Sequence, residues 1–205
     1  MMSFGKREIF CKLKKDLIQW HIDATFDCSP PGFYQCLIIS VFEEELNMFL
    51  PCYYVLMTNK TLTSYILALS MMNITVGPCK PGYVMHDFEA AIPKAVKRVF
   101  PNAKTTGCLF HFKQCLTRNM MKLSIPKDIA FKQVGWFDLL TVVPKDEIFS
   151  KALPFIEFNL LAMKEAEMEP WLQKSWNKFF EYVKRTFDNA NMISLMNYSD
   201  KIMDL

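Results

Sequence analysis

Three apolar runs separated by short polar turns occupy residues 19–58. The first, residues 19–27 (QWHIDATFD), is rich in bulky and β-branched side chains and is followed by Pro30, Pro31 and Gly32. The second, residues 33–42 (FYQCLIISVF), is almost continuously apolar, and so is the third, residues 52–58 (CYYVLMT). Runs of this length bounded by turn residues are typical of β-strands. Because their linkers are short, we expect the three strands to be antiparallel neighbours.

Beyond residue 58 the pattern alternates between helical and extended spacing. A helix is predicted after Thr61, and residues 83–86 (YVMH) indicate a short fourth strand. Residues 88–100 predict a second helix that buries Ile92, Val96 and Val99. Residues 108–112 (CLFHF) are a candidate fifth strand. A helical tail follows, with one apolar stripe formed by Leu172, Trp176, Phe179, Phe180, Val183 and Phe187.

The resulting order, β-β-β-α-β-α-β in a mixed sheet, is that of an α/β ribonuclease H-like fold followed by a helical insertion or extension. We therefore expect three segments along the chain. Residues 1–18 would be a basic lead-in, residues 19–122 the ribonuclease H-like core, and residues 123–205 the helical extension.

In this fold the first and fourth strands lie side by side, which gives two aspartates a special position. Asp23 lies in the first strand and Asp87 ends the fourth, so their carboxylates are expected to meet. Such hard oxygen ligands suit Mg²⁺ or Mn²⁺, the ions used in phosphodiester hydrolysis. A turn or capping role is the commoner reason for an aspartate at a strand end. We expect His21 to face away from Asp23 and to be structural.

Six short motifs in register resemble those of Mutator-like element (MULE) transposases. They are residues 20–26 (WHIDATF), 31–35 (PGFYQ), 59–61 (NKT), 86–91 (HDFEAA), 100–101 (FP) and 107–114 (GCLFHFKQ). The resemblance implies a DDE-type transposase core that acts on DNA in the nucleus or cytoplasm. It also implies that Asp23 and Asp87 are the first and second catalytic, metal-binding carboxylates. Ala24 departs from the family, whose members often carry glycine there.

The family's third acid is a glutamate beyond a helical insertion, and no match to its surroundings follows Phe187. Two hypotheses follow. The chain is a truncated or decayed copy of a nuclease and strand-transfer core, or it is a non-catalytic transposon-derived module that binds DNA or protein. Glu89 could lend a further ligand, although in the family it flanks the second aspartate. Whether the chain self-associates stays open.

Cys108 and His111 form a CxxH pair whose role the sequence leaves uncertain. A closed zinc site takes four ligands, and no second pair is present, so packing or substrate contact is favoured over zinc. The seven cysteines are spread through apolar segments without a CxxC pair, which favours reduced thiols.

Basic side chains are concentrated between residues 94 and 132, where nine Lys or Arg face the single acid Asp128. Such a stretch is suited to DNA phosphates, and it is also typical of a solvated helix face. We select five candidate DNA contacts from it: Lys94, Lys97, Arg98, Lys113 and Arg118. The sequence shows neither a run of about 18 apolar residues nor a signal peptide, so we expect no membrane span and no secretion.

Overall fold

The computed structural model describes residues 1–162 and 169–187 of the 205-residue chain. The chain divides into two compact units, with the boundary between Gly107 and Cys108. The first unit is built around a β-sheet and the second contains only helices. Each unit is described by itself below.

The first unit contains one six-stranded mixed sheet in the order β1-β4-β3-β2-β5-β6. Strands β2, β3 and β4 pair antiparallel, whereas β5 pairs parallel with both β2 and β6. This arrangement confirms the ribonuclease H-like fold, with β2 as its first strand and β5 as its fourth. The strands are β1 (Met2–Phe4), β2 (Gln19–Thr25), β3 (Gln35–Glu43), β4 (Met48–Met57), β5 (Tyr83–His86) and β6 (Lys104–Gly107).

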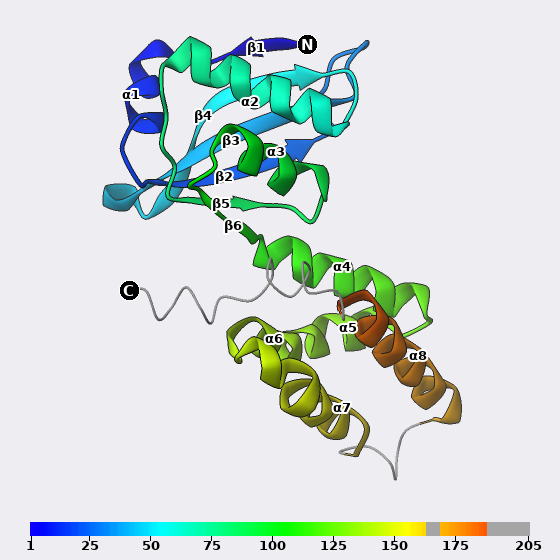
Figure 1. Cartoon of the computed structure of the whole chain (residues 1–205). Coiled ribbons are helices and arrows are strands. Elements are labelled where there is room, and N and C mark those ends of the chain that lie inside the picture. The colour runs from blue at the N-terminus through cyan, green and yellow to red at the C-terminus, as the bar shows by residue number, and fades with distance from the viewer. Residues whose placement is uncertain (163–168, 188–205) are drawn as a thin grey trace. The chain divides into compact units, whose positions relative to one another are not determined.

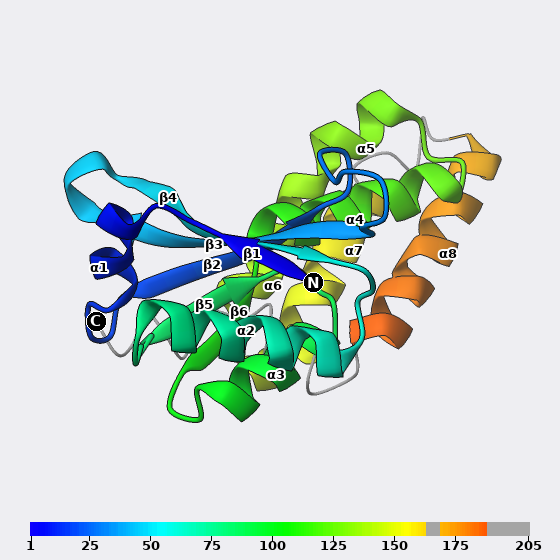
Figure 2. The same ribbon diagram turned by 90° about the horizontal axis from the view of Figure 1, so that it is seen from above.

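Two helices, α2 (Leu62–Val76) and α3 (Ala91–Val99), lie along the same face of this sheet (Figures 1 and 2). The β2 strand alternates accordingly, with Trp20 and Ile22 fully buried in the core shared with the helices. The alternate side chains, His21 and Asp23, belong to the opposite face. Thr61 caps α2, since its hydroxyl accepts a hydrogen bond from the Ser64 amide at 3.3 Å.

The predicted orientation of α3 is confirmed. Ile92 and Val96 are buried and Val99 is half-buried, whereas the basic side chains at positions 94, 97 and 98 are exposed. The helix is amphipathic because its apolar residues recur at helical spacing. Its cationic side therefore faces solvent within this unit.

The basic lead-in is part of the first unit. Residues 2–4 add the edge strand β1, which pairs with β4, and α1 (Phe10–Leu13) buries Leu13 in the core. Lys12 forms an ion pair with Glu43 at the end of β3, and Lys15 approaches the same carboxylate at 4.0 Å. The hydrogen bond from Lys12 lowers the pKa of Glu43. These contacts tie the lead-in to the sheet.

The second unit begins with α4 (Leu109–Lys122), and this corrects one prediction. Residues 108–112 were expected to form a strand, but they start a helix, and the fifth strand of the fold is β6 at residues 104–107. The helices that follow are α5 (Lys127–Gln133), a 3-10 turn at Val134–Asp138, α6 (Leu139–Val142), short turns at Lys145–Glu147 and Ile148–Ala152, α7 (Leu153–Ala162) and α8 (Pro170–Phe187).

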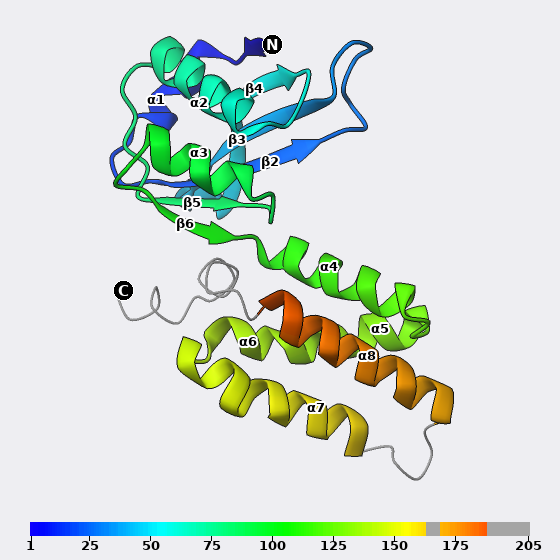
Figure 3. The same cartoon turned by 45° about the vertical axis from the view of Figure 1, so that its right-hand side comes forward.

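Aromatic side chains form the core of the helical unit. The predicted stripe on α8 is confirmed, because all six of its members are buried. Figure 3 shows α8 running alongside α4, and the rings of Phe187 and Phe112 join the two helices at 5.5 Å. Phe179 lies edge-on to Phe137 at 5.4 Å. Among the described residues no helix is long and apolar enough to cross a membrane.

Candidate functional site

Strands β2 and β5 position the two aspartates selected from the sequence. Ile22 is the register partner of His86 in this parallel pair, so Asp23 and Asp87 occupy the next position along. Both are half-buried. His21 was expected to face away from Asp23, but residues two apart in a strand share a face, so that expectation was wrong. The His21 ring packs against Phe49 at 5.4 Å.

Backbone amides orient both carboxylates. Asp23 Oδ1 accepts a hydrogen bond from the Ala24 amide at 2.8 Å, and Asp87 Oδ1 accepts one from the Glu89 amide at 3.0 Å. Such bonds reduce the freedom of each side chain before any ligand binds. The hydrogen bond to Asp87 also holds the Glu89 backbone close to the Asp87 carboxylate.

Glu89 has a cationic partner that the sequence did not reveal. Its carboxylate lies 3.4 Å from the Lys60 ammonium group at the start of α2. Lys60 belongs to the residue 59–61 motif and lies 29 positions earlier in the chain, so no helical or strand spacing predicts this contact. The ion pair therefore places the positive charge of Lys60 beside Glu89, two residues after Asp87.

Tyr65 of α2 is almost fully buried, and the charges of Asp87 and Glu89 act on it. Its hydroxyl accepts a hydrogen bond from the Gln35 side-chain amide at 2.8 Å, which joins α2 to the start of β3. Burial raises the pKa of Tyr65 to about 12, and the negative charges of Glu89 and Asp87 contribute to the rise. The pKa of Tyr65 therefore depends on the charges of Glu89 and Asp87.

We expect the Tyr65 phenol to ionise at pH about 12, well above the ordinary value of 10.0. The folded protein holds this proton more tightly than the unfolded chain does. The linked stability is therefore complete below pH 10 and is lost as the pH rises through about 12. Ultraviolet difference titration of the wild-type protein against Tyr65→Phe isolates this group. Asp87→Asn should lower its pKa, and ionisation near pH 10 would contradict the buried placement.

The Cys108 and His111 pair lies at the start of α4. Cys108 is buried at the N-cap position and His111 is half-buried one turn later. Within residues 1–162 and 169–187, no three His, Cys, Asp or Glu side chains gather as a metal site would require. The aspartate pair thus stands as a set of two hard oxygen donors. Residues 188–205, where no third acid was recognised, lie outside the described part, as do Glu165 and Glu167.

The candidate DNA contacts fall into two groups. Lys94, Lys97 and Arg98 are exposed on α3, where Lys97 also donates to the Pro101 carbonyl at 2.7 Å. Lys113 and Arg118 lie on α4 in the helical unit. The α3 group stands on the helical face of the sheet, opposite to the face that carries Asp23. Its cations are therefore not directly beside the Asp23 carboxylate.

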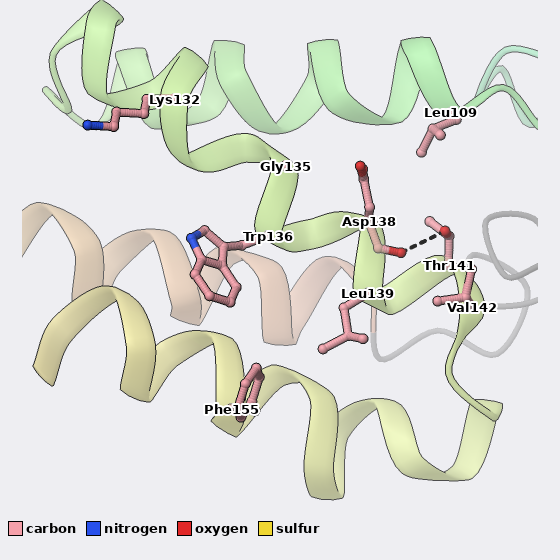
Figure 4. Close-up of a pocket in the computed structure, with 9 residues that line it drawn as sticks. All are labelled: Leu109, Lys132, Gly135, Trp136, Asp138, Leu139, Thr141, Val142 and Phe155. Carbon is pink, nitrogen blue, oxygen red and sulfur yellow. Dashed lines mark hydrogen bonds between the residues drawn. The ribbon is translucent and has the colours of Figure 1, made fainter. Parts of the chain in front are cut away.

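Lys113 has a carboxylate partner in the helical unit. Its ammonium group lies 2.7 Å from Asp138, which lines a wide hollow of about 660 Å³ (Figure 4). The Asp138 carbonyl in turn accepts a hydrogen bond from the Thr141 hydroxyl at 2.7 Å. Trp136 and Phe155 meet edge-on at 6.2 Å along the same hollow. Much of the Lys113 charge is thus met within the unit, which leaves Arg118 as the stronger phosphate candidate on α4.

Comparison with known families gives one match, to the MULE transposase domain over residues 19–115. That segment is just under half of the chain. It runs from the start of β2 into α4 and contains Asp23, Asp87, Cys108 and His111. The resemblance seen in the sequence motifs is thereby confirmed. No curated protein matches the chain.

Solved structures overlap with the chain only loosely. The integrase catalytic core domain of HTLV-2, solved in complex with magnesium, is 14% identical with a TM-score of 0.31, and covers 62% of this chain and 89% of its own. An intasome structure from simian T-cell lymphotropic virus is 14% identical with a TM-score of 0.32, and covers 64% of this chain and 51% of its own. The fold assignment rests on strand order and register, not on these overlaps.

Proposed function

We propose, on the match of residues 19–115 to the MULE transposase domain, that the chain acts on DNA through a divalent metal site at Asp23 and Asp87. The observation that carries the proposal is the register of β2 and β5. It brings two aspartates that are 64 positions apart in sequence to neighbouring positions on adjacent parallel strands. Adjacent carboxylates of this kind can hold the divalent ions that act in phosphodiester hydrolysis.

The donor set fits Mg²⁺ or Mn²⁺ better than a softer metal. Asp23 and Asp87 offer only oxygen atoms as metal ligands. The softer ligand Cys108, from the Cys108 and His111 pair, belongs to the other unit of the structure. A bound divalent ion would supply Lewis-acid stabilisation of the phosphate oxygens. The protein's own part is to hold both carboxylates in place through the Ala24 and Glu89 amides.

Cleavage requires more than these two ligands. Two-ion phosphodiester chemistry normally draws on a further acid, and the nearest one, Glu89, is engaged by Lys60 at 3.4 Å. We propose that the chain binds DNA phosphates but does not by itself cut DNA. Among the described residues the site then has two carboxylates and lacks a third. The second candidate function is a non-catalytic module that binds DNA or protein, and the same Lys60 pairing favours it.

A nicking assay on supercoiled plasmid in Mg²⁺ or Mn²⁺ distinguishes a chain that does not cut DNA from an active nuclease. We expect no nicking above background from the wild-type chain, because the described residues bring only two carboxylates together at the site. Nicking that disappears in both Asp23→Ala and Asp87→Ala would contradict this and would show that the chain completes its own site. Nicking that survives both substitutions would identify a contaminating nuclease.

The Lys60 and Glu89 ion pair gives a second prediction. Lys60→Met removes a positive charge and releases a carboxylate beside Asp87, so Mn²⁺ affinity should rise by about two- to fivefold, the range expected for a surface ion pair. Isothermal titration calorimetry measures the affinity. The matched control is Lys174→Met on α8, an exposed lysine of the other unit, which should leave it unchanged. An unchanged or lower affinity in Lys60→Met would contradict the charge argument.

A further inference from the structure

A second groove, apolar in its lining, lies on the helical unit, and its lining residues differ from those of the hollow in Figure 4. Its volume is about 400 Å³, and α4 contributes most of its lining. Phe110, Thr117 and Met121 recur along one side of α4 at helical spacing, and Phe131 of α5 faces them. The opposite side of α4, with Phe112, Leu116 and Met120, is buried in the core of the unit. The α4 helix thus has two apolar sides, and only one of them is covered within the unit.

The lining of the groove is largely apolar, although it includes Thr117. The Thr117 hydroxyl donates to the Lys113 carbonyl of its own helix at 2.9 Å, so its hydrogen-bonding capacity is turned toward the backbone. Two phenylalanine rings line the groove, and both are unusually exposed, Phe110 at 65% and Phe131 at 59%. Single exposed apolar side chains are common, but two rings around one groove indicate a binding surface.

Cations surround these rings. Arg118 lines the groove itself, and the Lys127 ammonium group lies 5.9 Å from the centre of the Phe131 ring. Within the part of the chain that the structure describes, no carboxylate forms an ion pair with Arg118, Lys122 or Lys132. Between residues 113 and 132 there are five basic side chains and one acid, Asp128. This surface therefore carries a positive charge that an anionic ligand would complement.

We propose that this groove binds single-stranded DNA, with bases stacked on Phe110 and Phe131 and with phosphates at Arg118 and the neighbouring lysines. Exposed aromatic rings interleaved with cations are the combination that recognises unpaired strands. A duplex cannot use the rings, because its base faces are already stacked inside the helix. The inference rests on the proposed action on DNA and deepens it by naming the form of DNA that the helical unit prefers.

Fluorescence anisotropy of the full chain with a labelled 12-nucleotide strand and a duplex of equal length tests the stacking. Phe110→Ala and Phe131→Ala should each weaken single-strand binding by about 5- to 100-fold, the range for loss of one stacked base. Both should leave duplex binding nearly unchanged. The control is Phe158→Ala on α7, which is exposed to 69% but lies outside the groove, and which should alter neither affinity.

The salt dependence of binding distinguishes the contribution of the phenylalanine rings from that of the basic side chains. Arg118→Gln should reduce the slope of log affinity against log salt for the single strand by roughly 0.7, the contribution of one phosphate contact. Phe131→Ala should lower the affinity at every salt concentration and keep the slope. A slope that changes equally in both variants would overturn the assignment of separate roles.

Four outcomes would overturn the inference. Equal weakening of duplex and single-strand binding by the phenylalanine variants would show that the rings do not stack on bases. Saturable binding of an acidic amphipathic peptide that Phe131→Ala abolishes, with single-strand affinity unaltered, would make the groove a protein-docking site. Duplex binding without single-strand binding would sink this inference alone, whereas failure to bind either form would also contradict the proposed action on DNA.

Discussion

Asp23→Asn and Asp87→Asn are each expected to lower the affinity for Mn²⁺ by at least about 10- to 100-fold. Losses of that size follow from removing residues that merely orient a metal ligand, and here the ligand itself loses its charge. Asparagine keeps the size of the side chain and its oxygen, so the Ala24 and Glu89 amides retain an acceptor. The effect should therefore be on the metal and not on folding.

Isothermal titration calorimetry, with thermal unfolding measured in parallel, checks this prediction. Asp128→Asn is the matched control, since Asp128 is exposed on α5 in the helical unit and should not alter the affinity. Equal loss of affinity in all three variants would point to nonspecific binding by surface carboxylates. An unchanged affinity in either Asp23→Asn or Asp87→Asn would remove that residue from the proposed site.

Trp20→Ala is expected to destabilise the first unit by about 3–5 kcal/mol, the usual cost of truncating a buried aromatic side chain. Trp20 is fully buried and lies edge-on to Phe100 at 5.2 Å, so the truncation leaves a cavity between β2 and the chain that follows α3. The same strand carries Asp23 three residues later. Losing this anchor should loosen the register on which the aspartate pair depends.

Urea unfolding followed by circular dichroism measures the change. Trp20→Phe should cost clearly less than Trp20→Ala, because it fills part of the space and removes an indole N–H that is buried without a partner among the described residues. Trp171→Ala, at a tryptophan exposed to 51%, should stay within about 0.5 kcal/mol of the wild type. A similar small change for Trp20→Ala would mean that Trp20 is not part of the core.

Much of this fold could be predicted from the sequence because its strands and helices are periodic. Residues 83–86 were placed as a strand and form β5 at those positions, and the burial of α3 followed from apolar residues at helical spacing. The apolar run at residues 108–112 was misleading. It starts the stripe that continues to Leu116 and Met120, so the helical period prevails over the local β-like composition.

The strands that were missed or displaced lie at the edges of the sheet. The β6 strand, KTTG, pairs with β5 and contains no apolar run of the kind by which a central strand is recognised. The β1 strand has three residues, and its partner among the described strands is β4. Short edge strands owe their conformation to the neighbour that they pair with, which a single-sequence pattern does not contain.

The candidate site divides in the same way. The topology alone predicted that Asp23 and Asp87 would occupy neighbouring positions, because a parallel β2 and β5 pair fixes their register. The ion pairs of Lys60 with Glu89 and of Lys113 with Asp138 join elements 29 and 25 positions apart. Contacts of that kind depend on tertiary packing, and no local spacing encodes them.

The most direct test of the metal site is a crystal structure of the chain soaked with Mn²⁺, with data collected to locate manganese by anomalous scattering. We predict one peak bounded by carboxylate oxygens of both Asp23 and Asp87, within the roughly 2.0–2.6 Å typical of hard divalent ions. A peak at other residues only, or the two carboxylates more than about 8 Å apart and too distant to share one ion or a pair of ions, would contradict the account.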